Sequence, residues 1–563
     1  MIQITQSNPN VEVHLPNGKT LTGPRGTTAE KFLKEVQSEF PALIVAAIIN
    51  DDIHELTYPI KTESTCIPII TDGPDGARIY RRSLTFLLEA AFVQCFKQGS
   101  LNVDHSVSSG GYYCEVKNRD PLSQDELNIL EAYMRKLVKE DLAFERRETP
   151  IQEAVDYFTK HGHEDKLRLL KHRHKEYLTL YAVGGLMDYM HGYMVPSTGY
   201  IQWFALKAVT GGFILQYPRR HKPTQLEEFG EYPKLIRAFR QYGNWLQTLR
   251  IDSVGALNDA IESGRADEVI LVSEALHEQN FADTAQQIAE KNSRIILIAG
   301  PTSSGKTTSS RRLAIQLLVR GISPYPLELD HYFVNRDETP LDENGLPDFE
   351  TIEALNLKRL ASDIEKLASG VEVQLPRYDF KTGRSEDGDV VKLRDGQPLI
   401  LEGIHGLNPR LIPEGWADSA FRVYVSALTQ LNLDRHNRVS TTDTRLIRRM
   451  VRDARERGYS AQATISRWES VRRGEKRHIF PYQENADVMF NSALVYELSA
   501  LKPLVEPLLR QVPFHSSEYI EARRLLAFLN WFLPLDASLV PMNSIVREFL
   551  GGSSLKDFKI WRG

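Results

Sequence analysis

A stretch in the middle of the chain has the composition and spacing of a loop that binds phosphates. Residues 300–307 read GPTSSGKT, follow the apolar run RIILIA and fit the pattern GxxxxGK[ST]. In such a loop, backbone N–H groups surround phosphate oxygens, and the next helix adds the positive end of its dipole. Lys306 is expected to reach the outer phosphates and the Thr307 hydroxyl to ligate Mg²⁺. The full set expected around a nucleotide is Gly300, Pro301, Thr302, Ser303, Ser304, Gly305, Lys306, Thr307 and Thr308.

Two carboxylates follow apolar segments that we expect to be strands beside this loop. Asp330 ends PYPLELD, and Glu402 ends PLILE. A carboxylate at such a strand end can accept a proton from an attacking hydroxyl or hold Mg²⁺. With two such carboxylates, one can hold Mg²⁺ together with Thr307, a role for which we expect Glu402, while the other orients or deprotonates the acceptor. The alternative is that each carboxylate only caps the turn that follows its strand.

Residues 441–460, TTDTRLIRRMVRDARERGYS, predict a helix that is rich in arginine. Four arginines recur there at helical spacing, namely Arg445, Arg448, Arg449 and Arg452. Because like charges at this density repel one another, something anionic is expected opposite them. We interpret the helix as a lid that closes over transferring phosphates and excludes water. A solvated basic face, offset by neighbouring acidic residues, is the alternative.

The elements that position these residues form several parts. Residues 290–510 alternate apolar strands with helical segments, which is typical of a parallel sheet covered on both faces. Residues 1–70 predict a hairpin around Asn17-Gly18 and a helix opened by a capping box between Thr27 and Glu30. The remaining parts are a mixed helix and strand unit (75–230), a helical connector (231–289) and a helical C-terminal segment (511–563). The sequence therefore predicts a multidomain α/β protein.

Composition limits the other functions that the chain could have. Its 563 residues suffice for roughly two to four domains. The 69 basic and 74 acidic residues give a net charge of −5, so no overall positive field indicates nucleic-acid binding. The three cysteines form no CxxC pair, and no signal pattern or run of membrane-spanning length is present. We expect a cytoplasmic protein that does not interact with membranes.

Seven motifs in residues 290–510 resemble, in order, those of the uridine kinase and phosphoribulokinase group of P-loop kinases. They are GPTSSGKTT, LDHYF, DFETIEALN, PRYDFKTGR, ILEGIHGL, DTRLIRRMVRD and NADVMF. The resemblance implies that ATP and Mg²⁺ are used and that Asp330, Lys306, Arg449 and Arg452 are catalytic, with Arg457 as a further lid arginine. The residues that it places on the substrate are Tyr332, Glu350, Tyr378, Phe380 and Arg449.

Two positions depart from the uridine kinase pattern. Gly383 stands where the family has a histidine that contacts the pyrimidine, and Tyr459 stands where a lid arginine contacts the base. A site that loses such hydrogen-bonding partners also loses discrimination. The expected activity is phosphorylation of a small-molecule hydroxyl, with the 5′-hydroxyl of a nucleoside such as uridine as the leading acceptor. A kinase for another sugar, polyol or sugar phosphate is the alternative.

The front of the chain resembles threonyl-tRNA synthetases. Residues 1–70 resemble their β-grasp TGS domain, and HSVSSGGYYCEV and HGYMVPSTGYIQWFALKAVTGGF resemble their second N-terminal domain, which removes misacylated serine. The four side chains of that editing chemistry fall on Arg82, Phe86, Met190 and Met194, so we expect the fold without the chemistry.

This likeness keeps a further hypothesis open, in which the front half docks on tRNA and the P-loop unit acts as a switch. The net charge of −5 does not favour it. The partners expected are therefore a small-molecule substrate and further copies of this chain in a homo-oligomer. Binding of nucleic acid by the N-terminal half stays an alternative.

Overall fold

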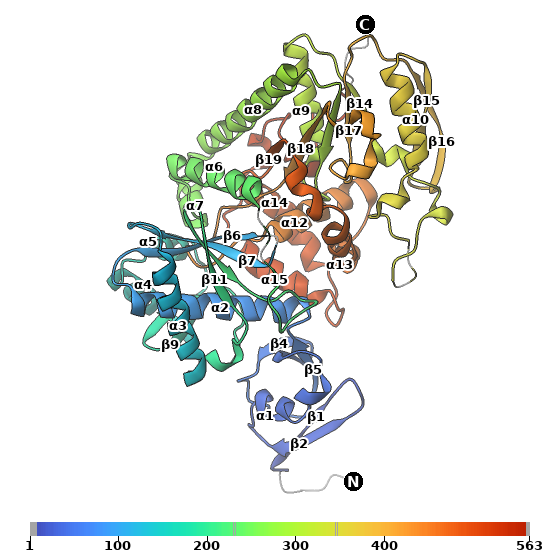
Figure 1. The fold of residues 1–563 in the computed structure, drawn as a ribbon. Coiled ribbons are helices and arrows are strands. Elements are labelled where there is room, and N and C mark those ends of the chain that lie inside the picture. Colours follow the sequence, from blue (N-terminus) through green and yellow to red (C-terminus); the bar gives the residue numbers. More distant parts are fainter. Residues whose placement is uncertain are drawn as a thin grey trace.

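The chain folds into three parts that follow one another along the sequence (Figure 1). The computed structural model describes residues 8–107, 109–228, 230, 232–343, 345 and 347–558. A small mixed sheet lies at the N-terminal end and a parallel sheet flanked by helices lies at the other, with an α+β unit between them. This arrangement confirms the predicted multidomain α/β architecture.

The N-terminal part is a five-stranded sheet with one α-helix against it. The strand order is β2-β1-β5-β3-β4, in which only β1 and β5 are parallel. The predicted capping box is wrong, because the helix begins after Thr28, and the Glu30 carboxylate instead accepts a hydrogen bond from the Tyr200 hydroxyl at 2.8 Å. The elements are β1 (Asn10–His14), β2 (Thr20–Pro24), α1 (Ala29–Lys34), β3 (Ile44–Ile49), β4 (Asp52–Glu55) and β5 (Ser64–Ile70).

The second part is built around the long helix α2 (Pro74–Cys95). Most of α2 is buried, because it packs against α3, against β6 and against the N-terminal sheet. Two antiparallel sheets complete this part, with orders β11-β12-β7-β6 and β10-β9-β8. The other elements are β6 (Ser100–Val107), β7 (Gly111–Lys117), α3 (Gln124–Glu140), β8 (Glu145–Pro150), α4 (Ile151–Lys160), α5 (Glu164–Lys171), β9 (Tyr177–Val183), β10 (Leu186–Asp188), β11 (Ala205–Val209) and β12 (Gly212–Gln216).

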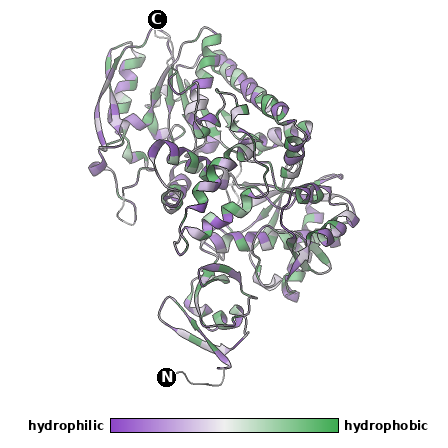
Figure 2. Ribbon diagram, turned by 180° about the vertical axis from the view of Figure 1, so that it is seen from behind, coloured by the Kyte–Doolittle hydropathy of each residue, from purple (hydrophilic) through white to green (hydrophobic). Residues whose placement is uncertain are grey.

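The third part contains the predicted parallel sheet, in the order β14-β17-β13-β18-β19. Its central strands are buried on both faces, whereas the outer helices in Figure 2 carry hydrophobic residues (green) together with hydrophilic ones (purple). The elements are β13 (Ile295–Ala299), α9 (Lys306–Val319), β14 (Tyr325–Glu328), α10 (Leu357–Ala368), β15 (Val373–Asp379), β16 (Arg384–Val391), β17 (Leu399–Glu402), α11 (Glu414–Ala417), β18 (Ala420–Ser426), α12 (Thr441–Arg457), α13 (Ala461–His478) and β19 (Val488–Asn491).

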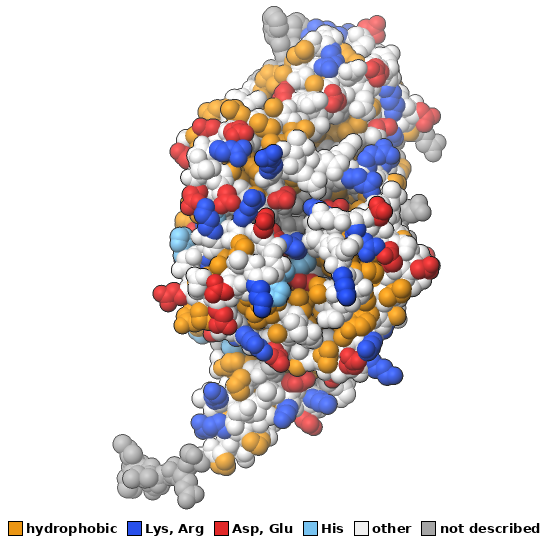
Figure 3. All heavy atoms as spheres, turned by 90° about the vertical axis from the view of Figure 1, so that its left-hand side faces the viewer, with side chains coloured by type: hydrophobic (Ala, Val, Ile, Leu, Met, Phe, Trp, Pro, Cys, Tyr) orange, Lys and Arg blue, Asp and Glu red, His pale blue; other side chains and the backbone are white. Residues whose placement is uncertain are grey.

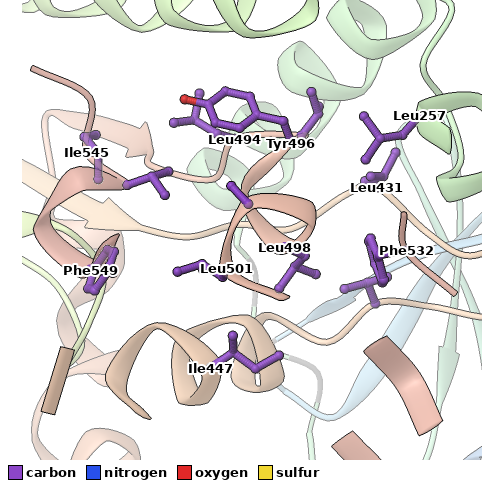
Figure 4. Close-up of a cluster of buried hydrophobic side chains, with 14 of the residues drawn as sticks. Leu257, Leu431, Ile447, Leu494, Tyr496, Leu498, Leu501, Phe532, Ile545 and Phe549 are labelled. Atoms are coloured by element: carbon purple, nitrogen blue, oxygen red, sulfur yellow. The ribbon is translucent and has the colours of Figure 1, made fainter. Parts of the chain in front are cut away.

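Helices that precede and follow this segment complete its core. The preceding ones are α6 (Pro233–Leu249), α7 (Val254–Glu262) and α8 (Ala266–Lys291), and the following ones are α14 (Glu497–Arg510), α15 (Tyr519–Leu529) and α16 (Arg547–Leu550). Figure 4 shows Leu257 of α7, Ile447 of α12 and Phe549 of α16 in one cluster of buried hydrophobic side chains. The rings of Phe281 in α8 and Phe490 in β19 stack at 4.3 Å. The predicted connector and C-terminal segment therefore share the core of the parallel sheet.

A buried group of charges joins the second part to the third. The Lys166 ammonium lies 2.8 Å from the Asp188 carboxylate and 3.2 Å from that of Asp434, and His436 Nδ1 lies 2.9 Å from Asp188. Burial alone would lower the pKa of Lys166, but the surrounding carboxylates hold it above its ordinary value. A buried cation so paired fixes the orientation of the two parts, because separating them would leave the charges unpaired.

The surface carries charges of both signs. On the face shown in Figure 3, Lys and Arg side chains are interspersed with Asp and Glu. Within the described ranges, no helix combines the length and the apolar character needed to span a bilayer.

Candidate active site

The phosphate loop comprises residues 300–305, which connect β13 to α9 at the carboxyl edge of the parallel sheet, and the first turn of α9, residues 306–308. The loop lies close to β18, since a Cβ atom on Gly300 would be 1.9 Å from the Val425 carbonyl oxygen. Only glycine fits at this position. Helix α9 begins at Lys306, so its free N–H groups point at the loop, as an anion site at a helix N-terminus requires.

Two of the four arginines predicted for the lid lie beneath the phosphate loop instead. Arg445 Nε donates to the Thr302 carbonyl oxygen at 2.9 Å, and Arg448 Nη1 donates to that of Ser303 at 3.4 Å. Both guanidinium groups are fully buried, and they pair with the carboxylates of Glu475 and Glu497. They therefore support the loop, and this corrects the prediction that all four arginines share the lid face.

Glu475 was missed in the sequence, although it holds the loop directly. Its carboxylate accepts a hydrogen bond from the Thr302 backbone N–H at 3.2 Å while it pairs with Arg445 and Arg472. Glu475 stands in a run of mixed charges on α13, where nothing in the spacing separates it from solvent-exposed neighbours. Only the packing of α13 against α12 brings Glu475 into contact with the phosphate loop.

The two predicted metal ligands are brought together. The Thr307 hydroxyl donates to Glu402 Oε2 at 3.2 Å, and Lys306 Nζ lies 3.9 Å from Glu402 Oε1. Hydroxyl and carboxylate oxygens are the ligands that Mg²⁺ prefers, so this pair fits the metal that the loop sequence implies. Asp330 follows β14, whose last residue Glu328 lies opposite Glu402 in the neighbouring strand.

We refer to Lys306, Thr307, Asp330 and Glu402 together as the recess. The carboxyl groups of the recess bind protons more tightly than is usual for Asp and Glu. Burial raises the pKa of Glu402 to about 8, with Lys306 opposing the shift and Asp330 adding to it. Asp330 is a solvent-exposed residue. Desolvation by the surrounding protein nevertheless raises the pKa of its carboxyl group, and the Lys306 ammonium partly offsets this shift. The loss of hydration around two neighbouring carboxyls is a common feature of sites that move protons.

Glu350, one of the residues predicted to contact the substrate, has one carboxyl oxygen that makes no hydrogen bond to the described residues. Its Oε2 atom is buried and has no hydrogen-bond partner among the described residues. Burial raises the pKa of Glu350 to about 8, as does Glu475, while Arg449 lowers it. A buried oxygen of this kind is costly unless a ligand supplies the missing hydrogen bond.

Phe349, the residue before Glu350, belongs to a cluster of four rings, Phe333, Phe349, Tyr378 and Phe380, which we call the aromatic wall. The rings of Phe333 and Phe349 lie 6.3 Å apart, and those of Tyr378 and Phe380 lie 5.1 Å apart. Phe380 and Phe349 are exposed, so their faces are free to contact a planar group. Tyr332, also predicted to contact the substrate, lies elsewhere. Its ring is buried in the core beneath β14, and its hydroxyl donates to Asp363 at 3.0 Å.

The two positions that depart from the uridine kinase pattern have new neighbours. Arg336 donates its backbone N–H to the Gly383 carbonyl oxygen at 2.8 Å and its Nη2 to the Phe380 carbonyl oxygen at 2.7 Å. The Arg336 guanidinium therefore stands beside the aromatic wall. Tyr459 is exposed, and the Arg467 guanidinium lies over its ring at 4.8 Å.

The other arginines that were predicted to belong to a lid all form ion pairs with one carboxylate. Arg449, Arg452 and Arg457 pair with Asp453 at 3.2, 3.0 and 3.4 Å. Arg449 also stands close enough to Glu350 for their charges to influence each other, and Arg457 likewise influences Asp330. In this arrangement the arginines lie next to the recess but are held by Asp453.

The C-terminal segment covers the phosphate loop, which the sequence did not indicate. Glu548 Oε2 accepts hydrogen bonds from the Thr308 backbone N–H at 3.2 Å and from its hydroxyl at 2.8 Å. Ile545 is so close to the loop that a Cβ atom on Gly305 would lie 2.5 Å from it. A carboxylate thus occupies a donor group that the loop offers to phosphates. Glu548 is 240 residues from Thr308 in sequence, so no local pattern reveals the contact.

The raised pKa of Glu402 predicts a pH-dependent stability. The folded protein keeps this proton up to about pH 8, whereas the unfolded chain releases it near the ordinary value of 4.5. Between these values the folded state binds more protons, so the free energy of unfolding falls as pH rises. Glu402→Gln cannot ionise and should raise Tm near pH 8 while leaving it almost unchanged near pH 5. Thermal unfolding without nucleotide or metal measures this, and a Tm difference that is constant across pH would contradict it.

Two regions of the chain are similar to known proteins. Residues 295–499 match the model of the Phosphoribulokinase / Uridine kinase family. The N-terminal region matches a threonine–tRNA ligase from Geobacillus sp. (strain WCH70), with 29% identity over 204 residues, which are 36% of this chain and 32% of the ligase. The chain therefore spans about a third of the length of the curated relatives that it matches.

Solved kinases are similar at low identity. A possible uridine kinase from Bacillus stearothermophilus matches with 23% identity, over 23% of this chain and 68% of its own, with a TM-score of 0.19. A D-glycerate 3-kinase from Cryptococcus neoformans matches with 15% identity, over 48% of this chain and 90% of its own, with a TM-score of 0.20. The comparisons therefore find two similarities in one chain, a family-model match over residues 295–499 and an N-terminal region similar to part of threonine–tRNA ligases.

Proposed function

We propose that this protein is an ATP- and Mg²⁺-dependent kinase that phosphorylates a small-molecule hydroxyl, with the 5′-hydroxyl of a nucleoside as the leading acceptor. The observation that carries the proposal is the contact of Thr307 and Lys306 with Glu402 at the strand edge where Asp330 also lies. A bound phosphate chain and a proton acceptor would meet at this edge. The family match of residues 295–499 supports kinase chemistry.

Each residue of the recess has a role in this proposal. The inward N–H groups of the phosphate loop and the Lys306 ammonium would bind the donor phosphates. Thr307 and Glu402 would hold Mg²⁺, which when bound neutralises charge on phosphate oxygens. The Asp330 carboxylate would accept the proton of the attacking hydroxyl. The side chains of Arg449, Arg452 and Arg457 would leave Asp453 and turn towards the phosphates when the substrates bind, while α12 itself stays fixed beneath the loop.

The acceptor side supports a polyhydroxylated ligand that carries a ring. Glu350 offers a buried oxygen that needs a hydrogen-bond donor, and a ribose diol supplies two hydroxyl donors. The exposed faces of Phe349 and Phe380 suit a planar base. Neither Gly383 nor Tyr459 provides the base contacts of uridine kinases, so we propose a nucleoside kinase that discriminates weakly between bases.

A second candidate acceptor is a sugar phosphate. The observation that favours it is Arg336, whose guanidinium stands beside Phe380 and has no carboxylate in ion-pair contact within the described part of the chain. A fixed guanidinium in an acceptor pocket suits a phosphate group.

A panel of nucleosides, sugars and sugar phosphates, scored by ADP release above the rate without acceptor, separates the two. We expect nucleosides to support turnover in the parent protein and equally in Arg336→Gln. If only phosphorylated sugars are turned over, and Arg336→Gln weakens that activity, the nucleoside assignment is wrong. Absence of turnover with every acceptor would contradict the proposed kinase.

Removing the base should abolish most activity without unfolding the chain. Asp330→Asn keeps the size of the side chain but cannot accept a proton, so kcat should fall by about 10²–10⁴-fold. Asp337→Asn, on an exposed turn of the same connection, is the matched control and should retain activity. Steady-state rates with equal Tm values decide the point. Near-normal kcat in Asp330→Asn would remove Asp330 as the base.

Glu548 should compete with the nucleotide for the phosphate loop. Its carboxylate occupies the Thr308 N–H and hydroxyl, and its charge repels phosphates nearby. Glu548→Gln keeps the size but removes the charge, so KM for ATP should fall by about 3- to 10-fold. Glu456→Gln, a partly exposed carboxylate on α12, is the control. An unchanged or higher KM in Glu548→Gln would show that Glu548 does not oppose nucleotide binding.

A further inference from the structure

A large cavity lies away from the recess, between the second part of the fold and α15. Its volume is about 590 Å³, and its walls come from α2, from residues 173–193 and from residues 520–531, with Asp52 and Ile53 of β4, Arg146 of β8 and Lys502 of α14 at its edges. No residue of the phosphate loop, and neither Asp330 nor Glu402, lines it. The volume lies within the range of sites that bind drug-sized ligands. The residues on which the following inference rests are Arg82, Arg173, Tyr189, His191, Arg524 and Trp531.

Two of the arginines that line this cavity make no ion-pair contact with a carboxylate of the described residues. Arg82 Nη1 donates to the Tyr193 carbonyl oxygen at 2.6 Å, and Arg173 Nη2 donates to that of Tyr177 at 3.2 Å. The Nε atom of Arg173 is buried and has no hydrogen-bond partner in the part of the chain that the structure describes. Within the described ranges, neither guanidinium has a carboxylate in ion-pair contact, whereas Arg524 in the same wall pairs with Asp443 and Glu521. Unpaired cations of this kind call for an anion.

The ionisation of neighbouring groups reports the same excess of positive charge. Burial lowers the pKa of both Arg82 and Arg173. Burial, together with the charges of Arg82, Arg524 and Arg173, lowers the pKa of His191 to about 3. The imidazole is therefore neutral at physiological pH. Desolvated cations that surround a neutral histidine are typical of a ligand site and not of a solvated surface.

Aromatic side chains line the cavity beside these cations. The Arg173 guanidinium lies over the Trp531 ring at 4.5 Å, and the rings of Tyr189 and Trp531 are 5.1 Å apart. Trp531 Nε1 donates to His191 Nδ1 at 3.3 Å, which fixes both rings. An inorganic phosphate would pair with the arginines, but the rings of Tyr189 and Trp531 and most of the cavity volume would make no contact with it. A ligand that joins a phosphate to a planar ring uses both.

We propose that this cavity binds a nucleoside phosphate, with its phosphate between Arg82 and Arg173 and its base against Tyr189 and Trp531. The site is distinct from the phosphate loop, so the chain would hold two nucleotides at once. It is connected to the loop through α12, because Arg524 pairs with Asp443 in the first turn of the helix that carries Arg445 and Arg448. Occupancy of the cavity can therefore alter the support of the loop.

The nucleoside phosphate has two sources, a free nucleotide or the end of a single-stranded RNA. A second cavity of about 510 Å³ adjoins the first and shares Arg78, Arg82, His191 and Arg524 with it. It also contains Arg438 and Lys476, so further phosphates along a strand would meet further cations. Burial and three neighbouring arginine charges lower the pKa of Lys476 to about 8.

Binding to the full-length chain tests the proposal. The probes are nucleoside mono-, di- and triphosphates and a short unstructured oligoribonucleotide, measured by calorimetry with Lys306→Ala as the background, which weakens the phosphate loop. We expect at least one probe to bind, and Arg82→Gln or Arg173→Gln to weaken it by about 10-fold or more. Arg173→Lys, which keeps the charge, should restore part of the affinity. Arg147→Gln, an exposed arginine paired with Glu145, is the matched control and should leave it unchanged.

Each outcome decides one way. Binding of mononucleotides identifies the free nucleotide as the source, and binding of the oligoribonucleotide alone identifies an RNA end, and both support the site. Absence of binding by every probe at millimolar concentration overturns the proposal. Equal binding by Arg82→Gln and Arg173→Gln, with Tm values matching the parent, also overturns it. Because these measurements need no turnover, they are independent of whether the proposed kinase activity is found.

Discussion

The buried pairing of Arg445 with Glu475 is the interaction on which the rest of the site depends. A phosphate loop turns its N–H groups inward and leaves its carbonyl oxygens on the other side, and those oxygens need donors. Arg445 and Arg448 supply them to Thr302 and Ser303, and Glu475 accepts from the Thr302 N–H. Because both arginines are buried, each requires its carboxylate, and the resulting pairs lock α12, α13 and α14 to the loop.

The proposed active site contains buried carboxyl groups whose ionised forms are energetically unfavourable. Glu402 and Glu350 are carboxyls whose protonated forms burial favours, and Glu350 has an oxygen without a partner. A fold optimised only for stability would replace both with neutral side chains. Their presence is intelligible when a metal ion and a hydroxylated ligand complete the site, because each supplies the missing counter-charge or hydrogen bond.

Much of the fold and part of the site could be predicted from local sequence. The strand before GPTSSGKT, the strand ends at Asp330 and Glu402, and the meeting of Thr307 with Glu402 all follow from short patterns with known geometry. The division of the arginines could not be predicted, because Arg445 and Arg449 lie on the same helix and differ only in what packs against them. Glu475 and Glu548 were missed for the same reason, since their roles come from contacts between distant segments. Thr27 and Glu30 had the right spacing for a cap, but the helix begins one residue later.

The core that buries residues from both sides of the parallel sheet bears on how such a chain can evolve. Phe158 and Leu169 of the ligase-like region belong to the same hydrophobic cluster as Ile296 of β13 and Phe549 near the other end. The two regions therefore share one hydrophobic core, and each covers apolar side chains of the other. A recombination that brought in a foreign kinase segment would leave apolar faces on both sides unmatched. A change of side-chain volume on one side of the junction is consequently expected to need a matching change on the other.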